Sequence, residues 1–412
     1  MSKLKKLLIN PIRFFKDSWV FFSSNISKIQ GVQNLFVISH LGQLGQVEAL
    51  IIKENFKKNS LIILYTNKNL KMPNVILEKV NSKLFIQIEL LRLPLAPNVI
   101  DLKKIINLNC IYSKLLNKIS PKELFILSFE KHYCLLAARA SDANININLV
   151  EEGTATYKYG SYESAIETLY SNLNKNEKKV ALLINKFSLF SPLRPVLKIH
   201  TDFKNGYICF PELLSNVFNI RNVSYFFVHE NGGVINKYIE NIKKSYKISC
   251  KDIIFLNQRY PFPKESYANI LVDILDNYTK KLNVKAFIKL HPKDSLDIKH
   301  ILENKIKNIK SSSIYLIDNP DFLVEPLIFL VKPKIILSLT STSLVYTKFL
   351  SKETSAISCY PIIRKRLLKL TQDMLSPNKF FQEADEHFSI LTKFDNVQIA
   401  YEDKDIINIL NR

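Results

Sequence analysis

The stretch Val284-Lys-Ala-Phe-Ile-Lys-Leu-His-Pro-Lys-Asp294 joins an apolar run to a histidine and a proline. Its β-branched and aromatic residues predict a strand, and Pro292 is expected to end it, because proline cannot donate a hydrogen bond to a β-ladder. His291 would then lie at the carboxyl end of a strand, where open α/β sheets bind their ligands. A single histidine in this position is more often structural than catalytic.

The stretch Asn144-Ile-Asn-Ile-Asn-Leu-Val150 has the same organisation in the first half of the chain. It also predicts a strand, and Glu151, Glu152 and Gly153 follow it directly. Charged groups at the carboxyl end of a strand in each half of the chain indicate two sheets that face each other across a cleft.

Strand-like and helix-like segments alternate on both sides of these stretches, which predicts α/β architecture with parallel sheets covered by helices. Strands are expected at residues 35–39, 61–65, 84–88, 124–128 and 145–150 in the first half, and at 251–256, 284–290, 313–317 and 334–338 in the second. Between residues 185 and 222 the periodicity weakens and three prolines occur, so we place the domain connection there. The predicted domains are residues 34–205 and 206–390, with a C-terminal helix in 391–412 that packs back on the first domain.

The formal net charge of this 412-residue chain is +21, from 58 Lys and Arg against 37 Asp and Glu. Such an excess indicates a polyanionic partner or an anionic membrane surface, although a lysine-rich background would give the same count. The five cysteines are scattered and form no CxxC pair. This distribution is typical of buried thiols in a reducing compartment, not of a disulfide framework or a zinc site.

Residues 1–33 form a separate N-terminal segment that mixes basic side chains with aromatic and aliphatic ones. This composition suits a helix at a membrane interface, interrupted at Pro11, or a helix docked on the core of the protein itself. No apolar run in the sequence is long enough to span a bilayer, and the first residues do not form a secretory signal.

The sequence argues against two common nucleotide chemistries. It contains only eight glycines, with neither a GxxxxGK[ST] loop nor a GxGxxG fingerprint, so it predicts neither triphosphate hydrolysis nor dinucleotide redox chemistry. A phosphate site of a different kind is suggested by the stretch Ser338-Leu-Thr-Ser-Thr-Ser-Leu344, where hydroxyls gather at an expected strand-to-helix turn. Helix N–H groups and these hydroxyls could bind a phosphate, or the stretch could be an ordinary helix cap. Glu325 precedes it and could contact a ribose or merely mark a helix start.

Three short motifs, taken together, resemble those of bacterial capsule sialyltransferases, and most of all the polysialyltransferases that build polysialic acid capsules. They are the acidic-acidic-glycine motif at 151–153, the His-Pro motif at 291–292 and the Ser/Thr motif at 340–343. The resemblance implies a GT-B fold of two Rossmann-like domains, CMP-sialic acid as the donor, inversion of configuration, and no metal or other cofactor. The first domain would bind the acceptor and the second the donor.

The resemblance also implies residue roles. Glu152 would be the general base, with Glu151 as the alternative, and Gly153 would let the backbone turn, although the two glutamates could instead cap a helix. His291 would stabilise or protonate the leaving phosphate. The remaining donor contacts would come from Gln258, Pro292, Glu325, Thr340, Ser341, Thr342 and Ser343.

The acceptor side is less defined. Gln43 lies in an expected strand-to-helix turn and could approach the sialic acid, whereas nearby His40 could be a ligand or a packed histidine. A basic groove would retain a polyanionic acceptor, and its binding should weaken with salt. Candidate groove residues are Lys68, Lys71, Arg92, Lys103 and Lys104.

We therefore predict a cytoplasmic enzyme, peripheral on the inner membrane, that adds sialic acid from CMP-sialic acid to the non-reducing end of an oligo- or polysialic acid acceptor during capsule biosynthesis. Its expected partners are this acceptor in a lipid-linked form and the capsule assembly machinery, but no nucleic acid. The alternatives are a monosialyltransferase acting on lipooligosaccharide, a polyol phosphotransferase, and a non-catalytic protein that binds polyanions or membranes.

Overall fold

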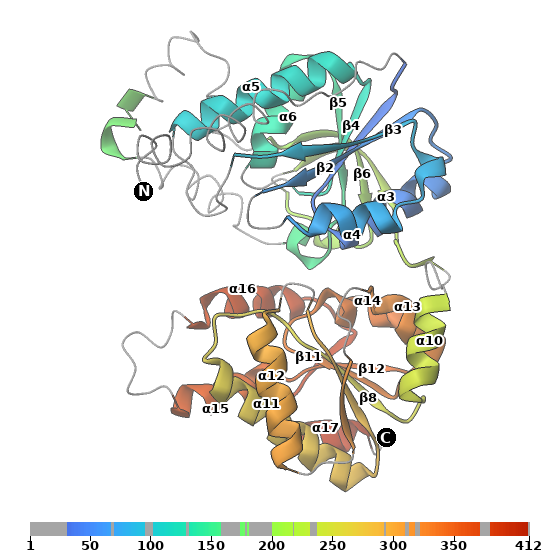
Figure 1. Ribbon diagram of the computed structural model, residues 1–412, viewed down its shortest axis with the longest axis vertical. Coiled ribbons are helices and arrows are strands. Elements are labelled where there is room, and N and C mark those ends of the chain that lie inside the picture. The colour runs from blue at the N-terminus through green and yellow to red at the C-terminus, as the bar shows by residue number, and fades with distance from the viewer. Residues whose placement is uncertain are drawn as a thin grey trace, which may run out of the picture. The chain divides into compact units, whose positions relative to one another are not determined.

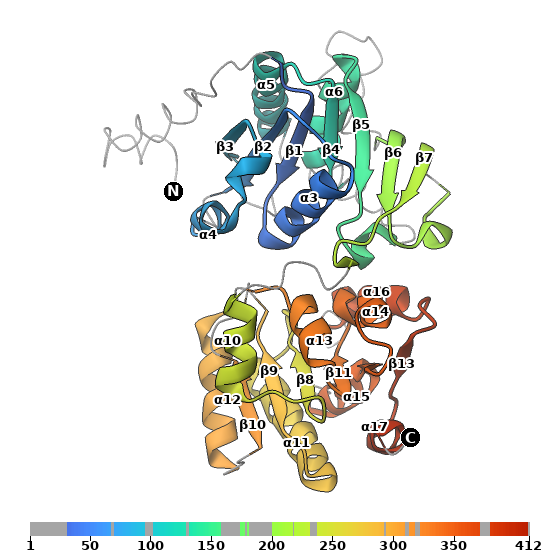
Figure 2. The same ribbon diagram turned by 90° about the vertical axis from the view of Figure 1, so that its right-hand side faces the viewer.

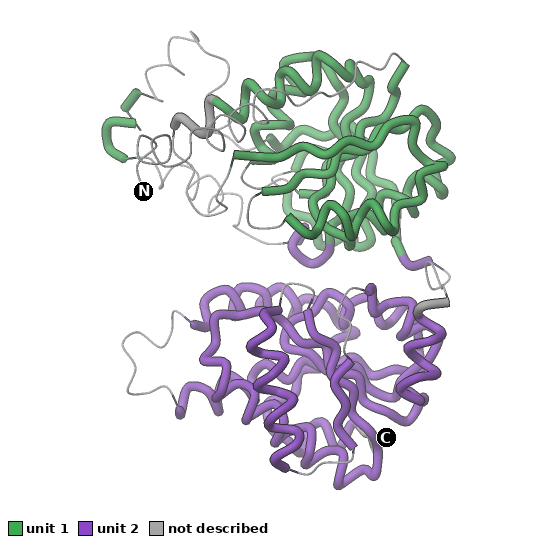
Figure 3. Tube along the Cα trace, viewed as in Figure 1, with its two compact units in different colours: residues 1–152, 159–228 green, residues 153–158, 229–412 purple. Residues whose placement is uncertain are grey.

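Two parallel sheets form in the chain, each within its own compact unit (Figure 3). Unit 1 consists of residues 1–152 and 159–228, and unit 2 of residues 153–158 and 229–412. The computed structural model describes residues 31–66, 70–94, 102–128, 132–157, 174–177, 179–180, 200–216, 218–230, 237–291, 294–309, 313–317, 322–370 and 380–410.

The sheet of unit 1 has the strand order β3-β2-β1-β4-β5-β6-β7, and every pairing is parallel. The strands are β1 (Asn34–Ile38), β2 (Asn59–Tyr65), β3 (Gln87–Arg92), β4 (Glu123–Ile126), β5 (Asn146–Val150), β6 (Asp202–Ile208) and β7 (Asn219–Tyr225). The helices are α3 (Leu41–Lys53), α4 (Met72–Lys79), α5 (Leu102–Ile119) and α6 (His132–Asp142). Helices α3 and α4 cover one face and α5 and α6 the other (Figures 1 and 2).

The core beneath α3 is aromatic and aliphatic. Phe36 of β1 stacks on Phe125 of β4 with 4.5 Å between ring centroids, and Leu44, Val47 and Leu50 of α3 are buried in the same cluster. Burying such side chains stabilises a fold by about 1.5–3 kcal/mol each. This packing fixes α3, and with it the turn that joins β1 to α3, against the sheet.

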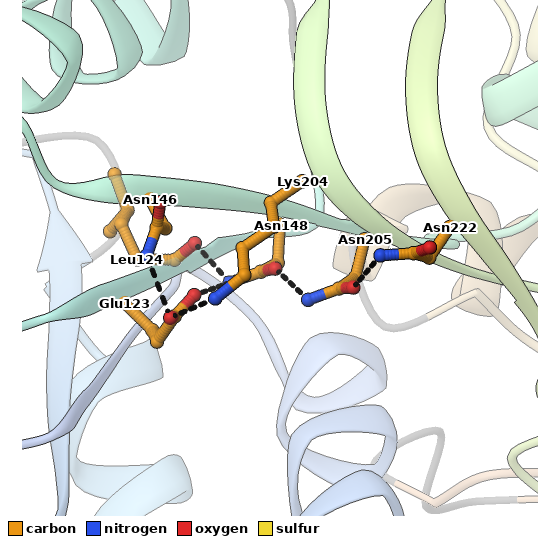
Figure 4. A network of polar contacts seen from close by, with 7 residues as sticks. All are labelled: Glu123, Leu124, Asn146, Asn148, Lys204, Asn205 and Asn222. Atoms are coloured by element: carbon orange, nitrogen blue, oxygen red, sulfur yellow. Dashed lines mark hydrogen bonds and ion pairs between the residues drawn. The ribbon is translucent and has the colours of Figure 1, made fainter.

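A row of side-chain amides crosses four strands of unit 1 (Figure 4). Asn222 Nδ2 donates to Asn205 Oδ1 (3.2 Å), Asn205 Nδ2 donates to Asn148 Oδ1 (2.7 Å), and Asn148 Nδ2 donates to Glu123 Oε2 (2.9 Å). Lys204 Nζ lies 2.7 Å from Glu123 Oε1. Burial alone raises the pKa of Glu123, but hydrogen bonds from Asn148, Lys204 and Asn146 lower it below its usual value. The row therefore ends on a carboxylate.

The sheet of unit 2 has the order β10-β9-β8-β11-β12-β13 and is also entirely parallel. The strands are β8 (Ile253–Leu256), β9 (Ala286–Lys289), β10 (Ile314–Ile317), β11 (Ile335–Ser338), β12 (Ser355–Ser358) and β13 (Val397–Ile399). The helices are α10 (Lys237–Tyr246), α11 (Lys264–Leu282), α12 (Leu296–Asn308), α13 (Glu325–Val331), α14 (Thr342–Leu350), α15 (Tyr360–Leu370), α16 (Gln382–Leu391) and α17 (Asp403–Leu410). A short 3-10 helix, η2 (Thr154–Tyr157), also belongs to this unit.

These two Rossmann-like units confirm the predicted α/β fold. The boundary between them differs from the one predicted at residue 205, because β6 and β7 pair with β5 and carry unit 1 as far as residue 228. The C-terminal segment differs as well. It forms β13 and then α17, and α17 belongs to unit 2: the Tyr278 hydroxyl of α11 donates to Asp403 (3.0 Å), and Ile406 is buried in the core of that unit.

One strand begins at a different residue from the one predicted. The strand predicted at 84–88 begins later, as β3, because residues Ser82–Leu84 form a 3-10 turn. The N-terminal segment up to residue 30 lies outside the described residues. Among the helices that the structure describes, none is long and apolar enough to cross a bilayer.

Candidate active site

In unit 1, sheet register brings a histidine and a glutamate to the same level. Phe36, Phe125 and Asn148 are register partners across the adjacent strands β1, β4 and β5. His40 and Glu152 lie equally far beyond this level, past the carboxyl ends of β1 and β5. Because β4 ends earlier, at Ile126, the two side chains can meet across its end.

The Glu152 carboxylate is held by two side chains that converge on one oxygen. His40 Nε2 lies 2.8 Å from Glu152 Oε1, and Gln43 Nε2 donates to the same oxygen at 2.9 Å. Gln46 Nε2 donates to the main-chain carbonyl of Glu152 at 3.0 Å. The Glu152 side chain remains 24% exposed, so it is both oriented and accessible.

The buried Gln43 amide has a fixed orientation. Its Oε1 accepts hydrogen bonds from Ser39 N (2.7 Å) and Ser39 Oγ (3.2 Å), and its Nε2 therefore points to Glu152. Both ends of this amide are engaged within the protein. The geometry supports a role for Gln43 in orienting Glu152, and its expected direct contact with the acceptor stays a prediction.

Glu151 has a different environment from its neighbour. Its side chain is buried, and its Oε2 accepts a 2.6 Å hydrogen bond from the Cys209 main-chain N–H, just after β6. A carboxylate buried against the backbone in this way joins β5 to β6. Of the two acids, Glu152 is the one whose side chain is partly exposed to solvent.

In unit 2, register aligns three of the predicted donor-site residues. Lys289, Leu256 and Ser338 are level on the adjacent strands β9, β8 and β11. His291, Gln258 and Thr340 lie two residues beyond this level, past the ends of β9, β8 and β11 respectively. They form a row at the carboxyl edge of the sheet, which is the position of ligand sites in folds of this class.

The main chain at His291 is closed into a turn by Asp294. His291 N donates to Asp294 Oδ2 (2.8 Å), and Asp294 N donates to the His291 carbonyl (2.9 Å). Asn257 Nδ2 also donates to Asp294 Oδ2 (2.7 Å). Burial raises the pKa of Asp294, although the hydrogen bonds from Asn257 and His291 oppose that shift. The turn fixes the place at which the half-buried His291 leaves the sheet.

The hydroxyl-rich turn before α14 is held by contacts within unit 2. Thr340 N and Oγ1 both donate to Gln258 Oε1, at 2.7 and 2.8 Å, and Ser341 caps α14 by accepting from Ser343 N (3.3 Å). Ser343 Oγ donates to Glu325 Oε1 (2.7 Å). The resemblance and the helix-cap interpretation are thus both compatible with this turn.

Glu325 has a second neighbour that the sequence did not indicate. His229 Nε2 lies 3.7 Å from Glu325 Oε2, and both side chains are largely buried. Burial lowers the pKa of His229, and the nearby Glu325 carboxylate opposes that shift. His229 therefore adds a titratable group beside the glutamate that was expected to contact a ribose.

Gly153 packs directly against the Ser/Thr turn. Its φ is +144°, a backbone conformation that residues other than glycine rarely adopt. A Cβ built there would lie 3.1 Å from Thr342 Oγ1. The next residue bonds to the same threonine, since Thr154 N and Oγ1 lie 3.3 and 3.0 Å from Thr342 Oγ1. Within unit 2, the glycine of the acidic motif is therefore in direct contact with Thr342 of the Ser/Thr motif.

Of the remaining predicted site residues, the structure describes the side chains of only Lys71 and Arg92. Pro292 and Lys68 lie outside the described residues, as do the side chains of Lys103 and Lys104 on α5. Lys71 is exposed at the start of α4, and Arg92 ends the edge strand β3. Lys71 and Arg92, whose side chains the structure describes, do not by themselves define a groove.

One protein family matches most of this chain. The model of the alpha-2,8-polysialyltransferase family matches residues 34–360, most of the chain. The chain belongs to this family. Alpha-2,8-polysialyltransferase membership makes the protein a sialyltransferase and hence a glycosyltransferase, with the acidic, His-Pro and Ser/Thr motifs all inside the matched range. The predicted family is therefore confirmed.

Solved structures similar to this polysialyltransferase establish the fold alone. The UDP-GlcNAc 2-epimerase of Methanocaldococcus jannaschii has a TM-score of 0.51 at 13% identity, covering 92% of each chain. The S. aureus MnaA–UDP structure has a TM-score of 0.52 at 12% identity, covering 92% of this chain and 95% of the other. The UDP-GlcNAc-bound UDP-GlcNAc 2-epimerase of Neisseria meningitidis has a TM-score of 0.50 at 13% identity, covering 92% and 100%. No curated protein sequence matches the chain.

Proposed function

We propose that the chain transfers sialic acid from CMP-sialic acid to the non-reducing end of an oligo- or polysialic acid acceptor, with inversion and without a metal ion or other cofactor. The observation that carries this proposal is the accessible Glu152 carboxylate, oriented by His40 and Gln43 at the carboxyl end of β5. Family membership supplies the substrate class.

In the proposed reaction, an acceptor hydroxyl oxygen attacks the anomeric carbon of the donor sialic acid. The bond from that carbon to the phosphate oxygen breaks, and CMP leaves with the bonding electrons. Glu152 takes the proton of the attacking hydroxyl, which is the role of a general base held within hydrogen-bond reach. Attack from the side opposite the phosphate inverts the configuration.

Residues of unit 2 are proposed to bind the donor. His291 would donate a hydrogen bond or a proton to the departing phosphate, while Thr340, Ser341 and Thr342 surround the first turn of α14, whose N–H groups and dipole favour an anion. The Ser343 hydroxyl already donates to Glu325, so Ser343 would act by holding Glu325 toward the ribose.

The acceptor and the cellular setting are inferred from charge. A growing polysialic acid chain carries one carboxylate per sugar, and a net charge of +21 would retain it through many additions. We propose the cytoplasm as the site of action, with peripheral association at the inner membrane beside a lipid-linked acceptor and the capsule assembly machinery. The rival enzyme is a monosialyltransferase that uses the same donor and acts on lipooligosaccharide.

The direct test is incubation of the purified protein with CMP-sialic acid and a fluorescent oligosialic acid, with EDTA and without added metal. Anion-exchange chromatography should resolve a ladder of longer products, because each addition contributes one negative charge. Addition of a single sugar would favour the monosialyltransferase. A reaction that needs added Mg²⁺ would contradict metal independence, and an unchanged donor and acceptor would contradict the proposed function.

His40 is expected to support Glu152. Replacing His40 with alanine removes one of the two donors to Oε1 and should lower kcat about tenfold, while glutamine, which can offer its own N–H, should restore much of it. Steady-state kinetics with the soluble oligosialic acid would measure both variants. The matched control is His300→Ala, because His300 also pairs with a glutamate (3.3 Å from Glu303) but is exposed on α12. Equal kcat in the His40→Ala variant and the wild type would contradict this role.

A further inference from the structure

Four polar side chains from three parts of unit 2 form a continuous chain of hydrogen bonds. Gln258 and Tyr260 follow β8, Thr340 follows β11, and His387 belongs to α16. Tyr260 Oη contacts Thr340 Oγ1 and lies 2.8 Å from His387 Nδ1. Thr340 in turn contacts Gln258 through both its main-chain N–H and its hydroxyl. Neither Tyr260 nor His387 was among the site residues predicted from the sequence.

The chemistry of the groups determines the direction of this chain. A main-chain N–H can only donate, so the atom of Gln258 that faces Thr340 N must be the amide oxygen. That oxygen can only accept, so the Thr340 hydroxyl uses its single hydrogen to donate to it. If the Gln258 amide were flipped, its N–H donors would face the main-chain N–H of Thr340, and two donors would oppose each other.

The same reasoning extends to the other two residues. Since the Thr340 hydroxyl hydrogen is used, Thr340 Oγ1 must accept from the Tyr260 hydroxyl, and Tyr260 Oη must then accept from His387 Nδ1. Burial raises the pKa of Tyr260, and this keeps the phenol protonated as the chain requires. His387 must therefore carry a hydrogen on Nδ1, in either charge state of the ring.

We propose that Tyr260 and His387 are positioning residues that hold Gln258 with its amide N–H groups turned toward the nucleotide donor. Gln258 then selects a hydrogen-bond acceptor on that donor, such as a phosphate oxygen or the cytosine carbonyl. This inference rests on the proposed function, because Gln258 is in the row with His291 at the carboxyl edge of the sheet. Neither Tyr260 nor His387 needs to touch the substrate.

The first test is Tyr260→Phe, which removes the link between His387 and Thr340 and keeps the ring. The KM for CMP-sialic acid and the Kd for CMP should each rise about tenfold, with kcat changed less than about twofold, because a ground-state contact is loosened. Tyr278→Phe is the matched control: it also removes a hydrogen-bonded tyrosine hydroxyl from unit 2, at Asp403 on α17. An unchanged KM and Kd in Tyr260→Phe, or an equal rise in both variants, would overturn the proposal.

The second test separates positioning from general structural damage. His387→Asn places a donor where Nδ1 stood and should keep the KM within about twofold of wild type, whereas His387→Gln extends its amide past Nδ1 and should behave like Tyr260→Phe. In ¹⁵N-histidine NMR of the full chain, the resonance lost in His387→Asn should show Nδ1–H. A neutral ring protonated only on Nε2 would overturn the proposal.

The outcomes also separate this inference from the proposed function. If wild-type protein elongates oligosialic acid and Tyr260→Phe does so with unchanged constants, the positioning role fails and the enzyme assignment stands. If wild-type protein does not use CMP-sialic acid, the proposed function fails. The NMR experiment still tests the hydrogen-bond chain in that case.

Discussion

Glutamine at position 152 is expected to lower kcat by about 10³-fold, within the range for losing a general base. The amide oxygen of glutamine can still accept from His40 and Gln43, so the local structure should persist. What is lost is the ability to take the proton of the attacking hydroxyl. Elongation of a fluorescent oligosialic acid would measure kcat, and calorimetry with CMP would show that the Kd for the nucleotide stays within about twofold.

The control for this substitution is Glu78→Gln, which makes the same chemical change at an exposed position on α4. It should leave kcat unaltered. Glu152→Asp retains a carboxylate on a shorter side chain and should keep partial activity. Full turnover in purified Glu152→Gln protein would remove Glu152 from the mechanism and return attention to Glu151.

Alanine at position 153 is expected to lower both stability and activity. The backbone there has a φ of +144°, and holding a side chain in such a conformation costs about 1–3 kcal/mol. The new methyl would also lie 3.1 Å from Thr342 Oγ1 and 3.2 Å from Thr342 Cγ2, so Thr342 must move at the start of α14. We expect a loss of about 2 kcal/mol in unfolding free energy and of about 10²-fold in kcat/KM.

Two variants divide the steric effect of this alanine from its conformational strain. Gly31→Ala introduces the conformational strain without the steric contact, because Gly31 has a φ of +86° and no atom lies within 4 Å of the added Cβ. Thr342→Ala in the Gly153→Ala background removes the two atoms in closest contact and should recover part of the loss. Chemical denaturation and steady-state kinetics would measure each variant. Additive effects in the double variant would contradict the contact.

Strand ends were the part of the site that the sequence predicted best. His291 and Glu152 each follow a predicted strand, and a parallel sheet necessarily gathers such positions at one edge. The same spacing from a strand end applies to His40, which the sequence left open. Gln43 was predicted to approach the sialic acid from a strand-to-helix turn. The sequence did not indicate that Ser39 and Glu152 engage both ends of its amide.

Other features could not be predicted, for two physical reasons. Strands β6 and β7 contain polar residues that hydrogen-bond to one another across the sheet, so they lack the apolar alternation by which strands are recognised. Tyr260 and His387 meet only through the packing of α16, far away in the chain, and no local pattern encodes that contact. Long-range pairing of polar side chains carries little signal in a single sequence.

The row of amides from Asn222 to Glu123 has a consequence for the chemistry at the opposite end of its sheet. Sliding β5 along β4 by one residue would separate Asn148 from Glu123 and displace everything on β5 by about 3.3 Å. Glu152 is rigidly continuous with β5, and His40 with β1. The β1–β4 pairing places His40 relative to β4, and the hydrogen bond between Asn148 and Glu123 helps to keep β5 in register with β4. The 2.8 Å contact between His40 and Glu152 therefore depends on the alignment of all three strands.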